Sequence, residues 1–253
     1  MGSGTVARAP RRRFVRQLDD AARDLGLRVR WLSGYWIAQL DAADTTRHVC
    51  GYTFPLNSSA AAQLARDKVA THAVLAAAGV PSVPHLLADS PETVAHQGFP
   101  AVIKPCRGYG GRGLTRVRDA ADLPAALAGH PETPAVAPWL DITAEYRLVM
   151  LDGAALLAYR KVLPAGAGGW QHNLTHGAVP RLVPPSRARD VLAAAAMRAL
   201  GLRFAAVDLV DVAGELSVLE VNGGVTLERF SAYDARHDRL AATVYREALA
   251  RCF

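Results

Sequence analysis

Two apolar segments near the C-terminus, joined by a short turn, constrain the fold of this chain more than any other feature. The runs Leu202–Val212 and Glu215–Val221 are rich in aliphatic and β-branched residues, and Ala213-Gly214 lies between them. A two-residue connection that contains glycine is typical of a β-hairpin with antiparallel strands. These segments therefore predict a sheet with a tight hairpin near the C-terminus.

The same hairpin carries acidic side chains, and their burial in an apolar sheet requires a compensating interaction. Because side chains alternate along a strand, pairing about the turn places Asp208 opposite Val218 and on the same face as Glu220 and Asn222. An isolated buried charge is unfavourable, so a hydrogen-bonding partner or a cation is expected beside these groups. Hard oxygen ligands of this kind suit Mg²⁺. The alternative is a hairpin whose acidic side chains point to solvent.

A second informative segment is a short apolar strand, Phe99–Pro105, that contains Lys104 and leads into a glycine-rich loop at Cys106–Gly113. Four glycines give this loop its freedom: Gly108, Gly110, Gly111 and Gly113. Such a loop can bring backbone amides close to phosphate oxygens. It lacks the Gly-Lys-Ser/Thr of a Walker A loop, and its glycine spacing differs from the dinucleotide fingerprint. It predicts a phosphate-covering flap, with a simple turn as the alternative.

These segments, together with others in the same order, resemble the ATP-grasp superfamily, and within it carboxylate–amine ligases of the RimK, glutathione synthetase and D-Ala–D-Ala ligase kind. Asn57-Ser58-Ser59 followed by Arg66-Asp67-Lys68 is similar to the helix that supplies the first ATP-binding lysine. Gly79–Pro84 resembles the connection into the central domain, and Lys104 with the glycine loop resembles the second lysine and the flap. The alternative for Lys68 is a solvated helix face.

Further motifs of the resemblance concern the nucleotide and the acyl phosphate. Trp139 and Leu140 are similar to the hinge that contacts adenine, and Glu145 to the acid that reaches the ribose. Arg160 resembles the arginine that steadies the acyl phosphate. If the strands on either side of Asp152-Gly153 pair directly, Glu145 and Arg160 lie opposite each other, and a plain cross-strand ion pair is their alternative role.

The last motifs concern substrate and metal. His172–Gly177 resembles the N-x-x-x-G stretch of the family, and Asp208, Glu220 and Asn222 match its metal triad. Four residues are predicted to contact the substrate: Asn173, His176, Gly177 and Glu228. The cofactors that the resemblance implies are ATP and Mg²⁺, with two ions expected and Mn²⁺ as a substitute.

The fold that the resemblance implies is the ATP-grasp fold, an α+β class in which two subdomains grip ATP. The expected organisation is a shortened N-terminal region at residues 1–56, a central subdomain at 57–140 with the lysines and the flap, and a C-terminal subdomain at 141–253 with the metal site. Residues 27–32 are expected to form a strand and the tract to Pro55 to be irregular. A single long helix is expected from Ser58 or Ser59 to about Ala78.

The activity that the resemblance implies is ADP-forming amide or peptide bond synthesis through an acyl phosphate. The partners are a carboxylate and an amine from an amino acid or peptide, and the shortened N-terminal region leaves room for a second copy of the chain or for a carrier or peptide partner. Two alternatives stay open: a nucleotide-binding partner subunit that needs a second protein, and an ATP-grasp kinase.

The net charge and the cysteine content indicate which ligands and which cellular compartment to expect. A net charge of +6 favours anionic ligands, but no nucleic-acid-reading motif accompanies it. Three widely spaced cysteines, Cys50, Cys106 and Cys252, without metal-finger spacing indicate a reducing cytoplasm. Neither a signal peptide nor an apolar run of about 18 residues is visible, so no membrane partner is expected.

Overall fold

The structure is a computed structural model, and it describes residues 12–108, 110–164 and 170–253. The chain divides into two compact units. Unit 1 combines residues 1–52 with residues 226–253, and unit 2 comprises residues 53–225. This grouping differs from the three consecutive segments expected from the sequence, because the last helices pack with the N-terminal residues.

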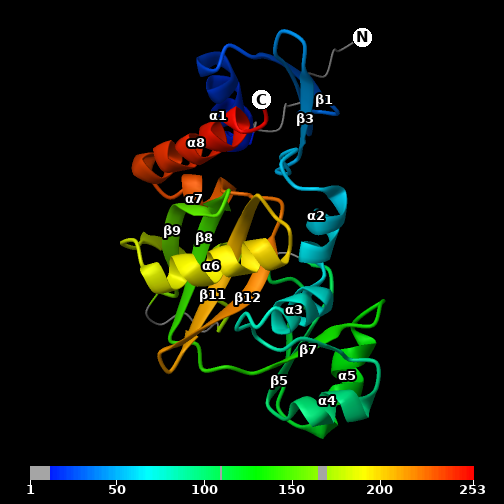
Figure 1. Cartoon of the computed structure of the whole chain (residues 1–253). Coiled ribbons are helices and arrows are strands. Elements are labelled where there is room, and N and C mark those ends of the chain that lie inside the picture. Colours follow the sequence, from blue (N-terminus) through cyan, green and yellow to red (C-terminus); the bar gives the residue numbers. More distant parts are fainter. Residues whose placement is uncertain (1–11, 109, 165–169) are drawn as a thin grey trace, which may run out of the picture. The chain divides into compact units, whose positions relative to one another are not determined.

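Within its described residues, unit 1 contains three helices and an antiparallel sheet in the order β1-β2-β3. Its elements are α1 (Arg13–Asp24), β1 (Arg28–Leu32), β2 (Ile37–Asp41), β3 (Thr46–Cys50), α7 (Glu228–Ser231) and α8 (Ala235–Ala250). Helix α1 is amphipathic and packs against α8 (Figure 1), with Phe14 and Leu18 fully buried. The expectation of an irregular tract up to Pro55 was wrong, because β2 and β3 complete a meander there.

One part of unit 2 is a four-stranded sheet in the order β4-β7-β5-β6. Its strands and helices are β4 (Leu86–Leu87), α4 (Pro91–Gln97), β5 (Ala101–Lys104), β6 (Thr115–Val117), η1 (Ala120–Asp122), α5 (Leu123–Ala128) and β7 (Ala135–Pro138). One face of the sheet packs Ile103 and Val136 against Val94 of α4 and Leu123 of α5. The opposite face carries Lys104, because side chains alternate along β5.

The helical segment that precedes this sheet is broken where the sequence predicted one continuous helix. Helix α2 (Ser59–Arg66) ends at Asp67, and α3 (Lys68–Ala77) begins directly after it. Asp67 has an extended backbone, and its carboxylate accepts a hydrogen bond from the Ala70 amide, so it caps α3. The break therefore places Lys68 at the very start of a helix.

The second sheet of unit 2 has five antiparallel strands in the order β10-β9-β8-β11-β12. Its elements are β8 (Ala144–Leu151), β9 (Ala154–Val162), η2 (Leu174–His176), β10 (Val179–Leu182), α6 (Arg187–Ala199), β11 (Phe204–Val212) and β12 (Glu215–Asn222). Helix α6 lies across one face (Figure 1), where Ala193 and Met197 pack against Leu148, Val207 and Leu209. The other face is left for polar side chains.

Both predicted hairpins of this sheet are present, and both contain a bulge. Positive φ angles at Ala213 and Gly214 form the β11–β12 turn, and Asp152 and Gly153 form the β8–β9 turn in the same way. The register shifts between Asp208 and Leu209 on β11 and between Val149 and Met150 on β8. A bulge adds one residue to a strand and so changes which residues face each other across it.

Asn57 connects the start of unit 2 to the five-stranded sheet through side-chain hydrogen bonds. Its amide nitrogen donates to the Phe204 carbonyl at 2.7 Å, and its amide oxygen accepts from the backbone amides of Arg203 and Phe204 at 2.8 and 3.0 Å. Three backbone groups thus depend on one side chain.

We expect Asn57→Ala to lower the free energy of unfolding by about 2–3 kcal/mol, because these backbone groups lose their partner. Urea denaturation would measure the loss. The neighbouring Ser58→Ala removes only the α2 cap, a single hydrogen bond to Ala61, and should cost about 1 kcal/mol. A loss in Asn57→Ala no larger than that of Ser58→Ala would contradict the expectation.

Among the described residues, no helix has both the length and the apolar character needed to cross a membrane.

Candidate active site

Five polar side chains share the face of the five-stranded sheet that α6 does not cover. Cross-strand pairing sets Glu145 opposite Lys161, and Asp208 opposite both Arg147 and Glu220. Directly paired residues point to the same face, so these side chains converge.

Asp208 is the centre of a buried charge network. It is 2% exposed, and it accepts hydrogen bonds from Arg147 Nε and Nη2 at 2.7 and 2.6 Å. Lys161 Nζ lies 3.0 Å from Asp208 and 2.5 Å from Glu145. The four side chains therefore form a row of alternating charge in the order Arg147, Asp208, Lys161 and Glu145.

The pKa values of the two carboxyl groups in this network shift in opposite directions. Burial disfavours the charged form of Asp208, but the attraction of Arg147 and Lys161 outweighs it and lowers the pKa of this carboxyl. For Glu145 burial prevails, so its pKa is raised although Lys161 opposes the shift. Asp208 is therefore the firmly ionised member of the pair.

The structure corrects two pairings that the sequence predicted. Asp208 lies opposite Glu220 rather than Val218, because the two-residue turn pairs Val212 with Glu215 and the bulge in the β11–β12 pair adds one further residue of shift. Glu145 lies opposite Lys161 rather than Arg160, because the bulge in the β8–β9 pair shifts that register as well.

The shifted register turns Arg160 away from the site. Arg160 pairs with Tyr146, which packs on the face covered by α6, and its guanidinium donates to the Thr143 carbonyl at 2.6 Å. The structure therefore does not bring Arg160 together with the other predicted residues. Lys161, which the sequence reasoning missed, occupies the site-facing position beside it. The alternation of Glu145-x-Arg147 with the hairpin turn was the signal for these cations, but only the bulge decides between Arg160 and Lys161.

Lys68 and Lys104 bring positive charge to the other side of the site. Lys68 Nζ donates to the Gly108 carbonyl at 3.1 Å and lies 4.0 Å from a Glu220 carboxylate oxygen. Lys104 is 8% exposed, and burial lowers its pKa to about 8, with Lys68 adding repulsion and Glu220 and Glu145 opposing the shift. Among the described residues, no ion pair or hydrogen bond satisfies the Lys104 ammonium. Within the described part of the chain this buried cation therefore has no carboxylate at ion-pair distance, although Glu220 and Glu145 attract it from further away.

The flap, residues Cys106–Gly113, touches both sides of this site; Tyr109 lies outside the described residues. On the α3 side, the Lys68 amide donates to the Cys106 carbonyl, and Arg107 pairs with Asp67 at 3.2 Å. On the other side, the Thr175 hydroxyl lies 3.0 Å from the Gly110 carbonyl.

Predicted substrate residues Asn173 and His176 surround one flap glycine. A Cβ placed on Gly111 would lie 3.0 Å from His176 Cε1, 3.1 Å from Asn173 Nδ2 and 3.2 Å from Gln171 Oε1. Gly177 ends the η2 turn with a φ of 92°. The structure thus joins the predicted flap to the predicted substrate segment.

An apolar cluster lies at the predicted adenine hinge. Val83, Ala137 and Val210 are buried there, with partly buried Leu140 and Leu219 packed against them. Leu140 therefore packs against a buried apolar cluster at the predicted hinge. The Trp139 ring instead has the Arg116 guanidinium 3.9 Å from its centre and Trp170 at its edge.

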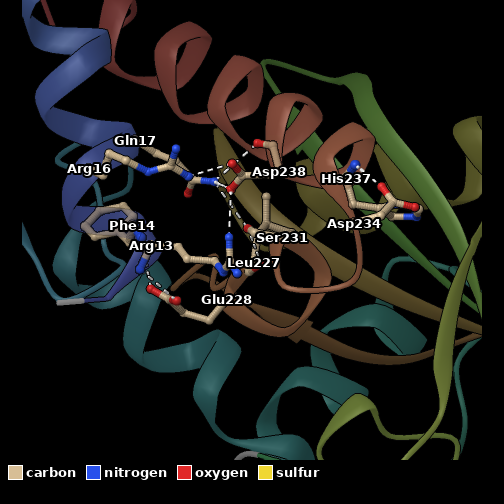
Figure 2. Close-up of polar contacts among 10 residues, drawn as sticks. All are labelled: Arg13, Phe14, Arg16, Gln17, Leu227, Glu228, Ser231, Asp234, His237 and Asp238. Carbon is tan, nitrogen blue, oxygen red and sulfur yellow. Dashed lines mark hydrogen bonds and ion pairs between the residues drawn. The ribbon is translucent and has the colours of Figure 1, made fainter. Parts of the chain in front are cut away.

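Glu228 lies in unit 1, where it caps a helix. Its carboxylate accepts hydrogen bonds from the backbone amides of Arg13 and Phe14, both at 3.1 Å, at the start of α1 (Figure 2). Tyr52 donates to it at 3.3 Å. An acid at a helix N-terminus is favourable, so the structure places the Glu228 carboxylate at the start of α1.

The donor set for Mg²⁺ fits at two of the three predicted positions. Glu220 is partly exposed and Asn222 donates to it at 2.8 Å, so carboxylate and amide oxygens stand together. Asp208 already accepts three hydrogen bonds or ion contacts from Arg147 and Lys161, and a carboxylate offers about four such positions. No group of three or more His, Cys, Asp or Glu with metal-site geometry occurs within the described part of the chain.

This arrangement of an α3 lysine, a strand lysine under a glycine flap, and an acid–amide pair on a second antiparallel sheet defines an ATP-grasp protein. The α+β fold expected from the sequence is confirmed by solved ATP-grasp structures of the same fold. Residues 65–239 match the family model of the RimK-like ATP-grasp domain, and the chain belongs to this family.

Relatives include a D-alanine–D-alanine ligase from Gloeobacter violaceus, which is 32% identical over 193 residues, covering 66% of this chain and 62% of the relative. The ribosomal protein bS6–L-glutamate ligase of Salmonella paratyphi B is 32% identical over 191 residues, covering 70% and 61%. The chain thus spans about three fifths of the length of these relatives.

Among solved structures, the ATP-grasp ligase PsnB complexed with a minimal precursor is similar with a TM-score of 0.55 and 24% identity, covering 74% of this chain and 63% of PsnB. The D-alanine–D-alanine ligase of Bacillus anthracis has a TM-score of 0.58 and 18% identity, covering 78% and 71%. Both likenesses concern the fold.

Proposed function

We propose that this protein is an ATP- and Mg²⁺-dependent carboxylate–amine ligase that releases ADP and phosphate. The observation that carries the proposal is the buried Lys104, which has no ion-pair partner among the described residues and whose pKa responds to the charges of Lys68 and Glu220. A polyanion with an associated cation would satisfy both lysines and the carboxylate at once. The matching family and its ligase relatives support the same conclusion.

In the proposed reaction, a substrate carboxylate attacks the γ-phosphorus of ATP, and the bond to the β-phosphate oxygen breaks to release ADP. An amine then attacks the resulting acyl phosphate, loses a proton and displaces phosphate to form an amide. Lys68 and Lys104 neutralise phosphate charge, and amides of the flap glycines 108, 110, 111 and 113 bind phosphate oxygens. Mg²⁺, when bound, offsets the charge that develops on the phosphates.

The remaining roles in this proposal concern the binding of Mg²⁺, adenine and the ribose. Glu220 and Asn222 would hold Mg²⁺ through oxygen atoms, while Asp208 fixes Arg147 and Lys161 behind them. Leu140 and its apolar neighbours would accept adenine. Glu145 reaches the ribose in this proposal, and the backbone of Trp139 contributes to the hinge.

The substrate segment in this proposal is 171–177, where Asn173 and His176 meet the flap. We assign the two substrates to the amino-acid and peptide class, since the named relatives join D-alanine to D-alanine or L-glutamate to a ribosomal protein. PsnB is seen with a precursor peptide, which favours a peptide as the larger partner. Cys50, Cys106 and Cys252 are present as thiols, which agrees with the cytoplasmic setting of this proposal.

Product analysis tests this function. The purified protein with ATP, Mg²⁺ and a panel of amino acids and dipeptides should form ADP, phosphate and an amide in equal amounts. AMP and pyrophosphate would exclude an acyl phosphate, and a stable phosphorylated product formed without amine would indicate a kinase. ATP binding without any product until a second protein is added would indicate a partner subunit.

A further inference from the structure

The positive charge of this chain is concentrated between Asp152 and Asp208. That segment contains seven lysines and arginines and a single acid, Asp190, so its net charge of +6 equals the net charge of the whole chain. Lys161 and Arg203 belong to ion pairs of the two flanking aspartates. Four of the other arginines form a group that we call the arginine patch: Arg160, Arg181, Arg187 and Arg189.

The arginine patch is assembled from β9, β10 and the first turn of α6. Arg160 and Arg181 are direct partners in the β9–β10 pair, so their side chains point to the same face of the sheet, the face on which α6 lies (Figure 1). Tyr146 is the partner of Arg160 on β8, and the Arg189 guanidinium lies 4.6 Å from the centre of the Tyr146 ring. Arg187 is exposed at the first position of α6. Cations from three elements therefore share one region of this face.

Two local rules about charge are broken within the arginine patch. Like charges directly opposite each other on neighbouring strands repel, yet Arg160 faces Arg181. Positive side chains are unfavourable in the first turn of a helix, yet α6 begins with Arg187 and Arg189, and the side chain of Ser186 does not cap this helix. Both arrangements become favourable when an anion binds between the cations.

The acids on this face do not neutralise the arginine patch. Asp190 lies in the first turn of α6, and within the described part of the chain it forms no ion pair. Asp211 shares the face, but its carboxylate accepts a hydrogen bond from the Thr143 hydroxyl at 3.1 Å. Arg160 and Arg189 donate to backbone carbonyls, both at 2.6 Å, which orders the two guanidinium groups but leaves their charge unbalanced.

Carboxylates of a polypeptide suit the arginine patch better than a nucleic-acid backbone does. A guanidinium group binds a carboxylate through two parallel hydrogen bonds, so neighbouring arginines match neighbouring acidic side chains. Surfaces that bind single-stranded nucleic acid add aromatic rings on which bases stack. The Tyr146 ring is covered by Arg189 and packs against the core under α6. Pro184 and Pro185, both exposed just before α6, add apolar surface for a polypeptide.

We propose that the arginine patch is a docking surface for an acidic segment of a polypeptide partner, whose Asp or Glu carboxylates bind between the guanidinium groups. The inference goes beyond the proposed function, because Arg160 lies on the opposite face of the sheet from Lys161 and Asp208. Docking at this surface needs neither ATP nor turnover. The bound carboxylates also remove the repulsion between the arginines, so charge complementarity selects an acidic partner.

Two charge reversals on one helix test this inference. Arg187→Glu lies in the patch, whereas Arg198→Glu lies in the last turn of α6, about 16 Å away along the helix and beyond the screening length of about 10 Å at moderate salt. Binding of a fluorescent oligoglutamate peptide to the full chain is measured by anisotropy. We expect Arg187→Glu to raise the Kd at least about tenfold, Arg198→Glu to change it less than about twofold, and Arg187→Lys to keep most of the affinity.

Thermal unfolding separates docking from a structural role. An acid is favourable in the first turn of a helix and unfavourable in the last turn, so Arg187→Glu should raise the unfolding midpoint slightly and Arg198→Glu should lower it. The variant that loses peptide binding is therefore the more stable of the two. If Arg187 were needed only for structure, its binding and its stability would fall together.

Other outcomes would overturn the inference. They are parental affinity for oligoglutamate in Arg187→Glu, an equal loss of affinity in Arg198→Glu, and no binding of oligoglutamate by the parent protein. Equal binding of oligoglutamine would show that charge is not recognised, and tighter binding of a single-stranded oligonucleotide of the same charge would show a nucleic-acid surface instead. Because the measurement uses no ATP, it succeeds or fails independently of the proposed function.

Discussion

Replacing Lys104 with methionine is expected to make the protein more stable and at the same time a poor binder of ATP. Lys104 is buried, and burial lowers its pKa from 10.5 to about 8. This shift corresponds to a penalty of about 3 kcal/mol for holding the charged ammonium in the folded state near pH 7, at about 1.4 kcal/mol per pKa unit. Methionine keeps the length of the side chain and removes the charge, so most of this penalty disappears.

The dependence on pH identifies the cause. Below pH 8 Lys104 is charged in both states and the full penalty applies. Between about pH 8 and 10.5 the folded protein has lost this proton while the unfolded chain still binds it, so the parent becomes more stable as the pH rises. The advantage of Lys104→Met should therefore be largest at neutral pH and shrink towards pH 10. Urea denaturation at several pH values would measure it.

ATP binding should change in the opposite direction. Losing a charge-assisted contact to phosphate should raise the Kd for ATP about 10- to 100-fold. Lys68→Met is the matched control, because Lys68 already has Gly108 and Glu220 as partners and its removal should bring no gain in stability. If Lys104→Met is less stable than the parent at pH 7, or binds ATP with parental affinity, Lys104 is a structural residue rather than a phosphate ligand.

Local chemistry explains which parts of the fold could be predicted from the sequence. Gly153, Gly214 and Asp152 suit the positive φ angles of the two turns, and both hairpins formed as expected, although Ala213 adopts a φ of 54° that alanine does not favour. Ser90 with Pro91 marks the start of α4 by the same kind of local rule. Asp67 carries such a signal too, as a helix cap, but an alanine-rich sequence around it favoured one continuous helix.

Bulges were the main obstacle to predicting the site. A bulge depends on how two strands pack in three dimensions, and no residue in β9 or β12, the strands that carry the extra residue, indicates it. One residue of shift moves a side chain to the opposite face, so Lys161 rather than Arg160 joins Glu145 and Asp208. The residue types were thus foreseeable, whereas the choice between neighbours was not.

Contacts between distant segments were the other obstacle. The packing of α1 on α8 joins residues more than 200 positions apart, and neither helix has a sequence signal for its partner. Glu228 follows a glycine turn just after the metal-site hairpin, which suggested a place near substrate. Only the fold of unit 1 shows that it meets the N-terminus of α1.

Asp208→Asn and Glu220→Gln are expected to fail in different ways, although the sequence placed both acids in one metal triad. Asparagine at 208 keeps the shape but leaves Arg147 and Lys161 buried without their common anion. Breaking a buried ion pair in this way costs about 3–5 kcal/mol of stability. Glu220 is partly exposed and has no short ion pair, so its change to glutamine should alter stability by less than about 1 kcal/mol.

Activity should reverse this order of severity. Under the proposed function Glu220→Gln removes the partly exposed carboxylate that would bind Mg²⁺, so ADP release should fall below about 1% of the parental rate and recover in part at high Mg²⁺. Adding Arg147→Met to Asp208→Asn leaves the Lys161–Glu145 pair intact and should restore part of the lost stability, which urea denaturation would detect. Equal losses of stability in the two single variants would show that Asp208 does not stabilise the fold as the counter-ion of Arg147 and Lys161. Parental turnover of Glu220→Gln with an unchanged Mg²⁺ dependence would remove Glu220 from the proposed metal site, because a neutral amide cannot replace the negative charge with which a carboxylate ligand balances Mg²⁺.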